Sequence, residues 1–403
     1  MGNVFNIVGC ECSKMHQKSN SIHKVRVSDS TSSELISSTI IPKELYKDET
    51  KKPQYQKYIT KKPSKDYNVL DKYTKICEIG RTHYSTVYKA QNKLNNEFRA
   101  LKEIPKENIE NADDTKNIVL SVGMLRGLEH PNLIKLYEFY EDEKNYYIIN
   151  ELCDEIDLDE ILKERILLCE FLVKYIMYQI FSAINYLHKQ KIIHGNVKIT
   201  NVGIVYNNKN KNNENENENN NEETNLSLKD LINIISDDEN LQKELLHEKY
   251  FTFLSDKAKL FLKNLSKYEF KLLDCWSQDI FIKNQSENDN SDIILNINYL
   301  SPELFDGYIV KERDEWACGI LMFNLIKGYY PFDGDSKEEL VLDIVNGNND
   351  VESEIKNLKV SNECKDLLKK LLERKINNRI KVEDVFKHDF FQNGIKIEDL
   401  SNL

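Results

Sequence analysis

The pattern of apolar and polar positions divides the chain into a part rich in strands and a part rich in helices. Short apolar or alternating runs, which are typical of strands, occupy residues 76–89, 98–104, 133–140, 146–152 and 270–273. Apolar residues at three- and four-residue spacing, which predict helices, occupy 113–128, 158–162, 171–188 and much of 314–391. Because the strands come mainly first and the helices mainly later, we expect two lobes with a cleft between them.

Three segments interrupt this pattern. Residues 1–65 are rich in Ser, Thr and Lys and carry 12 basic against 6 acidic residues, a balance of +6 that predicts a disordered basic tail. In 207–221, 10 of 15 residues are Asn, which predicts a solvated loop. Helical apolar spacing returns over 226–265, so we interpret 207–265 as an insertion with a helical second part, serving either for docking or as a tolerated surface expansion.

Composition excludes several classes of protein. At 40% apolar residues the chain can bury a sizeable core, and no apolar run approaches the roughly 18 residues of a membrane-spanning helix. Eight scattered cysteines without C-x-x-C spacing indicate neither a zinc ribbon nor a disulfide framework, and favour the cytoplasm as location. A net charge of −11 argues against nucleic acid as the main partner.

Short motifs follow one another in a characteristic order. They read Ile79-Gly80, Val87-Tyr88-Lys89-Ala90, Ala100-Leu101-Lys102, His130-Pro131-Asn132, Glu151-Leu152-Cys153, His194-Gly195-Asn196-Val197-Lys198 with Asn201, Leu272-Leu273-Asp274, Ser301-Pro302-Glu303, Asp314-Glu315-Trp316 and Asn378-Arg379-Ile380. In this order they resemble a eukaryotic protein kinase domain over roughly residues 70–392, closest to the calcium/calmodulin-dependent and calcium-dependent kinases. No D-x-D-x-D-G loop follows, so we expect no calcium-binding EF-hands in this sequence.

The resemblance implies an α+β, bilobal fold. Its β-rich N-lobe is expected at about 70–152 and its helical C-lobe at about 153–392, with the tail 1–69 before them and 393–403 after them. It also implies ATP and Mg²⁺ as cofactors and a protein as substrate or partner.

The resemblance assigns each part of the site to residues of this chain. Nucleotide contacts fall on Ile79, Gly80, Val87, Ala100, Lys102, Glu151 and Cys153. The magnesium positions are Asn201 and Asp274, and the catalytic-loop positions are Asn196 and Lys198. The usual glutamate partner of Lys102 is missing, because its position holds Ser121. We therefore expect Lys102 to pair with Asp274, or to be solvated.

Several positions depart from the family pattern. Thr82 and Ser85 replace two glycines of the phosphate-binding loop, which predicts a stiffened loop or a hairpin that merely covers the cleft. Asn196 replaces the aspartate that accepts the substrate proton, and losing such a base typically costs ~10²–10⁴-fold in rate. Gly195 replaces an arginine that grips a phosphorylated activation segment.

The metal-binding triplet and the position that supports the adenine from below also differ from the family pattern. The triplet reads Asp274-Cys275-Trp276 instead of Asp-Phe-Gly, and Gly203 stands where a leucine supports the adenine. The column of side chains that links the lobes is expected to consist of Leu125, Leu136, Cys275 and His194. Taken together, these changes favour catalytic degeneration.

The remaining motif matches indicate residues that stabilise the fold. Glu303 and Arg379 are expected to form a buried ion pair, and Asp314 and Trp316 to begin a hydrophobic central helix. Asp157 fits either a ribose or substrate contact at the cleft edge or a solvated surface acid.

The first residues allow two interpretations. Gly2 would become the N-terminus after methionine removal, but the myristoylation pattern wants Ser or Thr where Asn6 stands. Cys10 and Cys12 are candidates for palmitoylation, and the basic tail favours an anionic membrane. The segment is therefore either a lipidated peripheral membrane anchor or a plain tail.

Three functions follow from these patterns. The first is a pseudokinase that binds ATP through Lys102, Asn201 and Asp274 and acts as an allosteric partner or scaffold. The second is a weakly active serine/threonine kinase in which Asn196 positions the hydroxyl. The third is a nucleotide-free docking module.

Overall fold

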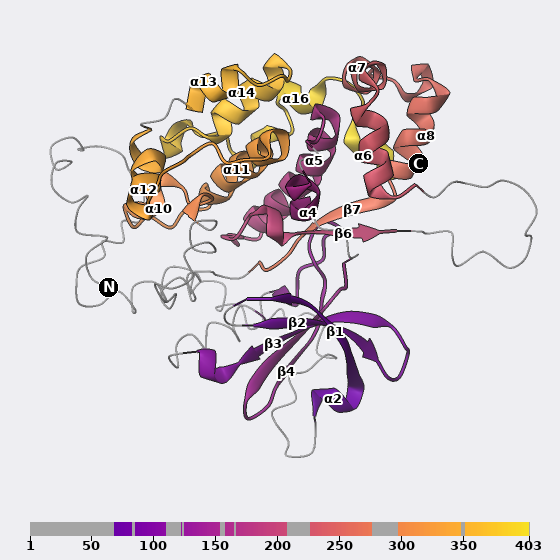
Figure 1. Ribbon diagram of the computed structural model, residues 1–403, viewed down its shortest axis with the longest axis vertical. Helices are drawn as coiled ribbons and strands as arrows, with labels where there is room; N and C mark the ends of the chain where they lie inside the picture. The colour runs from indigo at the N-terminus through magenta and orange to yellow at the C-terminus, as the bar shows by residue number, and fades with distance from the viewer. Residues whose placement is uncertain are drawn as a thin grey trace, which may run out of the picture.

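The computed structural model has an antiparallel sheet at one end and a larger helical part at the other (Figure 1). It describes residues 68–82, 85–109, 122, 125–153, 158–164, 167–207, 226–275, 297–347 and 351–402. This arrangement is the expected bilobal α+β fold. Within the described residues, no helix is long and apolar enough to cross a lipid bilayer.

The N-lobe is built on five antiparallel strands. They are β1 (Tyr73–Arg81), β2 (Thr86–Asn92), β3 (Phe98–Pro105), β4 (Leu136–Glu141) and β5 (Asn145–Asn150), in the spatial order β1-β2-β3-β5-β4. A short helix, α2 (Val69–Lys72), precedes them, and its N-terminus is capped by Asn68, which accepts a bond from Leu70 N. A one-turn 3₁₀ helix, η2 (Lys106–Asn108), follows β3.

One strand prediction is wrong in detail. The single strand expected at 76–89 is a hairpin of β1 and β2, with Gly80 opposite Val87. The chain reverses between Thr82 and Ser85, where Thr82 N donates to Ser85 O at 2.8 Å. The apolar pattern continues on both sides of this turn, so periodicity alone did not reveal it. The expected strand at 133–140 likewise begins later, at Leu136.

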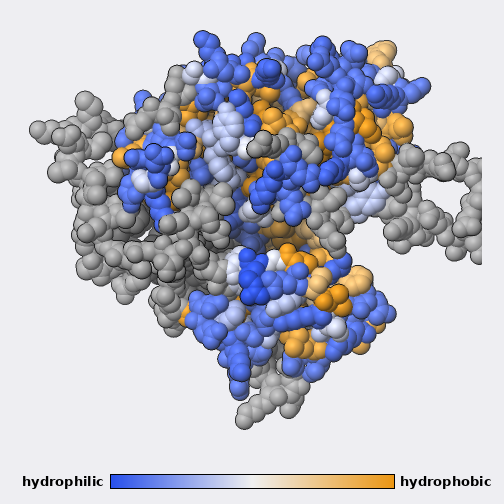
Figure 2. Space-filling view, in the orientation of Figure 1, coloured by the Kyte–Doolittle hydropathy of each residue, from blue (hydrophilic) through white to orange (hydrophobic). Residues whose placement is uncertain are grey.

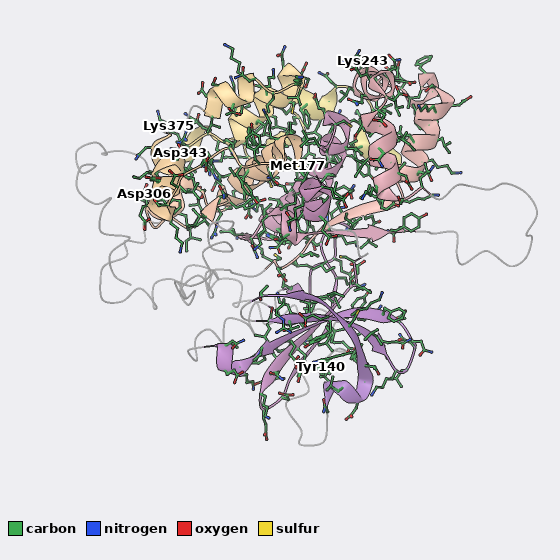
Figure 3. All side chains as sticks on the ribbon, in the orientation of Figure 1. Tyr140, Met177, Lys243, Asp306, Asp343 and Lys375 are labelled. Atoms are coloured by element: carbon green, nitrogen blue, oxygen red, sulfur yellow. The ribbon has the colours of Figure 1, made fainter. Side chains whose placement is uncertain are left out.

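The C-lobe surrounds two long apolar helices. Its helices are α4 (Leu158–Lys163), α5 (Glu170–Lys189), α10 (Pro302–Phe305), α11 (Arg313–Lys327), α12 (Lys337–Asn346), α13 (Val351–Lys356), α14 (Asn362–Leu371), α15 (Val382–Val385) and α16 (Asp389–Gln392), with 3₁₀ turns η3 (Ile199–Asn201), η8 (Ile376–Asn378) and η9 (Ile397–Asn402). α5 and α11 pack against each other; 13 of the 20 residues of α5 and 14 of the 15 residues of α11 are buried. Figure 3 shows Met177 of α5, which has no exposed surface, at the centre of the lobe.

The C-lobe also contains a two-stranded sheet on its side toward the N-lobe. β6 (Val202–Tyr206) pairs antiparallel with β7 (Tyr268–Leu272), and Figure 1 shows this pair on the side of the helical lobe that faces the sheet. Between the two strands in sequence lie α6 (Leu228–Ser236), α7 (Glu239–His247), the 3₁₀ turn η5 (Phe251–Phe253) and α8 (Asp256–Leu265). Their helical nature agrees with the periodicity of 226–265.

The expected scaffold contacts are present. Arg379 binds Glu303 through two contacts of 2.6 and 2.9 Å, and neither side chain is more than 4% exposed. Removing one partner of such a pair leaves a buried charge and costs roughly 3–5 kcal/mol. Asp314 and Trp316 lie in the first turns of α11, as expected, and both are buried.

Candidate functional site

An ion pair joins the two lobes at the cleft. Lys102 of β3 is 3% exposed, and its Nζ lies 2.9 Å from both carboxylate oxygens of Asp274, which follows β7. Burial alone would raise the pKa of Asp274, but the charge and hydrogen bonds of Lys102, with a contribution from Lys198, hold it below its usual range. The expected pairing of Lys102 with Asp274 is therefore confirmed.

Asn201 is bonded through its backbone to the residue that precedes Asp274. Asn201 O accepts a bond from Leu273 N at 2.9 Å, which fixes the start of β6 against the end of β7. Asn201 Nδ2 donates to Asn196 O at 2.9 Å, so its side-chain oxygen is the atom left for another partner. Asn201 and Asp274 thus bring two hard oxygen donors, the ligand type that Mg²⁺ prefers. The described residues contain no cluster of three or more His, Cys, Asp or Glu that could hold a metal, so remaining ligands would have to be phosphates and waters.

The catalytic loop is held rigidly by α11. Asp314 accepts bonds from His194 N and Gly195 N, both at 2.8 Å, and Asn196 N donates to His194 Nδ1 at 3.2 Å. Gly195 has φ +71°, a left-handed conformation that favours glycine. Asn196 is 6% exposed, and its Oδ1 has no hydrogen-bond partner among the described residues. An acceptor atom is therefore buried and unsatisfied at the position where the resemblance predicts a substitute for the general base.

An arginine from another element lies against Gly195. Arg313, which begins α11 and is 5% exposed, donates to Gly195 O at 3.2 Å. Its guanidinium carbon lies 3.8 Å from where a Cβ at position 195 would be. A guanidinium is thus present beside the loop although the motif itself has lost its arginine. Sequence analysis missed this residue, and its only signal was its place immediately before Asp314.

The phosphate-loop positions are stiffened by side-chain bonds. Thr82 Oγ1 lies 2.9 Å from Ser85 Oγ and accepts a bond from Ser85 N at 3.1 Å. Ser85 is only 3% exposed. Two glycines could make none of these side-chain contacts, so the geometry agrees with the expectation of a stiffened loop.

The expected adenine-facing residues lie on neighbouring strands of one sheet. Val87 and Ala100 are partly buried on β2 and β3, and Ile79 of β1 is 45% exposed. Glu151 follows β5, and its backbone N–H donates to Lys135 O at 2.8 Å.

The segment after β5, residues 151–153 and here called the hinge, is tied to the C-lobe by a buried lysine. Lys271 of β7 is 7% exposed and lies 3.1 Å from Glu151 Oε1. Glu151 Oε2 accepts a further bond from Lys135 N at 3.2 Å. The carboxylate of Glu151 therefore braces the connection between the lobes. No motif or pattern in the sequence indicated that Lys271 would reach Glu151.

A cysteine side chain lies against Gly203 of β6. A Cβ added at Gly203 would lie 2.4 Å from Cys153 Sγ and 3.0 Å from Leu273 Cδ2. The Cys153 side chain thus lies where a larger residue at position 203 would have to be. Gly203, which departs from the family pattern, and Cys153, which belongs to a matching motif, therefore fit each other in space.

Three members of the expected inter-lobe column line one small cavity. Leu125, Leu136 and Cys275 line it together with Asp274, and its volume is about 30 Å³, room for about two waters. His194, the fourth member, is 1% exposed, and burial lowers its pKa although Asp314 and Asp274 oppose this.

Several expectations lie outside the described residues. These are Ser121, Asp157, Trp276, Gly2, Cys10 and Cys12, the Asn-rich tract from 208 onward and most of the helix expected at 113–128.

Comparison with known proteins gives one family. The model of the protein kinase domain matches residues 73–212 and 244–391. Calcium-dependent protein kinase 5 of Plasmodium falciparum (isolate 3D7) is 27% identical over 328 residues, which cover 81% of this chain and 46% of that protein. Calcium-dependent protein kinase 3 of Plasmodium yoelii yoelii is 28% identical over 315 residues, which cover 78% of this chain and 47% of that protein. The chain spans about half the length of these curated relatives.

Proposed function

Because the chain belongs to the protein kinase domain family, we propose that it is a pseudokinase that binds ATP and acts on a protein partner as an allosteric subunit or scaffold. The observation that carries this proposal is the combination of an intact Lys102–Asp274 pair with an amide, Asn196, at the base position. Lys102 and Asp274 keep the cation and the carboxylate that binding of a magnesium nucleotide needs. Asn196 replaces the general base that phosphate transfer needs.

The described residues fit a magnesium nucleotide. Asn201 and Asp274 offer oxygen ligands, and Lys102 offers a cation for the phosphates. Ile79, Val87, Ala100, Glu151 and Cys153 are the proposed contacts of the base, and Gly80 the remaining loop contact. Bound Mg²⁺ would offset the charge of the phosphate oxygens.

The chemistry of Asn196 limits turnover. A neutral amide oxygen accepts a hydrogen bond from a hydroxyl but does not take its proton, and a positioned general base is typically worth ~10²–10⁴-fold in rate. Lys198, the other proposed catalytic-loop residue, is a cation near Asp274 and supplies no base. The bonds between Thr82 and Ser85 further restrict how the phosphate loop can follow the phosphates.

One observation favours a second function, a slow serine/threonine kinase. The buried Asn196 Oδ1 without a partner is an acceptor that a substrate hydroxyl could satisfy. In that case Asn196 orients the hydroxyl, and the reaction proceeds without proton abstraction by the protein.

Thermal unfolding of the full chain with ATP, with and without Mg²⁺, tests the proposal. A ligand at about 100-fold excess over Kd stabilises by ~2.7 kcal/mol, which raises Tm by several degrees. We expect a Mg²⁺-dependent rise that Asp274→Asn abolishes. Asp335→Asn, which changes an exposed carboxylate, is the matched control and should keep the rise.

The remaining outcomes separate the alternatives. A Mg²⁺-dependent rise without phosphate transfer supports the pseudokinase. Transfer that Asp274→Asn abolishes supports the slow kinase instead. The absence of any shift at millimolar ATP overturns both and leaves a nucleotide-free docking module.

A further inference from the structure

Three large apolar side chains are exposed close together in sequence, between α7 and the middle of α8. Tyr250 is 64% exposed, Phe253 74% and Leu260 54%. The rings of Tyr250 and Phe253 meet edge to face with centroids 5.9 Å apart. Single exposed apolar residues are ordinary on a protein surface, but such a concentration marks an interaction surface.

These side chains are exposed although other apolar side chains of the same segment are buried in the core. Leu254, Ala258 and Phe261, which alternate with them in the sequence, are at most 3% exposed. The segment is also anchored, because Ser255 caps α8 by accepting a bond from Ala258 N and is itself bound by both carboxylate oxygens of Glu244. The exposed residues therefore lie on a fixed support.

The charge around these rings has the opposite sign to that of the chain. Residues 249–267 contain five lysines and one aspartate, a balance of +4, whereas the chain carries −11. Three carboxylates of the α7 segment lie near these lysines and are engaged. Glu248 accepts bonds from Lys249 N and Tyr250 N at 2.9 and 3.1 Å, Glu244 binds Ser255, and Asp238 pairs with Lys257 at 2.6 Å. Figure 2 shows hydrophobic atoms among hydrophilic ones at the outer end of the helical lobe, where Figure 1 places α8.

We propose that the η5–α8 surface, defined as Lys249, Tyr250, Phe253, Leu260 and Lys263, binds an anionic lipid bilayer. The two rings expose most of their area at a short turn, so both are available to enter an interface together. A bilayer interface accepts aromatic rings at the level of the headgroups while lysines contact anionic lipids. This proposal is independent of whether the cleft binds a nucleotide.

Co-sedimentation of the full chain with vesicles tests this surface. We compare phosphatidylcholine vesicles with vesicles that also contain phosphatidylserine, using protein made without lipidation. Binding should require phosphatidylserine and fall at high salt. Each lysine near an anionic surface contributes about 1 kcal/mol, so Lys249→Gln/Lys263→Gln should weaken binding by roughly 25-fold. Tyr250→Ser/Phe253→Ser should weaken it as well.

Matched variants carry the same changes elsewhere. Lys369→Gln/Lys381→Gln removes two exposed lysines, one in α14 and one just before α15, and Leu94→Ser/Tyr329→Ser removes two other exposed apolar side chains. Both should bind like the unaltered chain. If the surface variants bind as well as these controls, the basic tail accounts for the binding and the proposal is wrong. The proposal is equally wrong if the chain ignores phosphatidylserine vesicles.

Discussion

His188 carries a positive charge inside the helical lobe because two carboxylates face it. Its Nε2 lies 2.9 Å from Asp314 Oδ2, and its Nδ1 lies 3.5 Å from Glu315 Oε1, a distance beyond an ordinary hydrogen bond. Burial opposes the charged ring, but the two carboxylates prevail and raise the pKa of His188 to about 9. Because Asp314 also holds His194 N and Gly195 N, this charge supports the anchor of the catalytic loop.

The stability of the chain should therefore depend on pH through His188. Its folded pKa of about 9 lies above the ordinary value of 6.5, so its contribution is complete below the ordinary value and is lost as pH rises through about 9. We expect His188→Gln to flatten the loss of unfolding free energy over that window, measured by urea unfolding at several pH values. A variant curve that stays parallel to the original would show that His188 does not carry this dependence.

At the scale of elements, periodicity predicted most segments because burial repeats along them. The strand expected at 98–104 is β3, and the helix expected at 171–188 is α5, each within one residue at either end. Periodicity failed at 76–89, because polar side chains that bond each other close a turn that the apolar pattern does not reveal. Contacts between elements were also hidden, such as the Cys153 side chain packed against Gly203 of β6.

The contact between β6 and the hinge should be sensitive to a single methyl group. We expect Gly203→Ala to destabilise the fold by roughly 1–3 kcal/mol, because the new Cβ would overlap Cys153 Sγ. Cys153→Ala removes that sulfur, so the double variant should recover part of the loss. A double-mutant cycle by urea unfolding measures this coupling, and additive effects would contradict the contact.

At the scale of the whole molecule, the candidate site combines residues of both lobes. The sequence predicted the residues of the site better than it predicted the side chains that contact them. The family resemblance and the missing glutamate partner led to two alternatives for Lys102, a solvated side chain or a pair with Asp274, 172 positions later, and the structure shows the pair. It could not predict that Arg313 lies against Gly195 or that Lys271 braces Glu151, because neither contact follows from a short motif. Long-range pairs outside the motifs depend on how α11 and β7 pack.

A single reversion should therefore not restore a working kinase. We expect Asn196→Asp to keep the fold, since the position is anchored through backbone bonds of the loop, and to raise phosphate transfer only slightly. The new carboxylate would supply a base, but the stiff Thr82–Ser85 turn and Ser121 in place of a glutamate would remain. The measurement is transfer from labelled ATP to a generic protein substrate, with an active calcium-dependent kinase assayed in parallel. If the single variant matched the activity of the active kinase, Asn196 alone would account for the low activity of this chain. The altered phosphate loop and the missing glutamate partner of Lys102 would then not limit phosphate transfer.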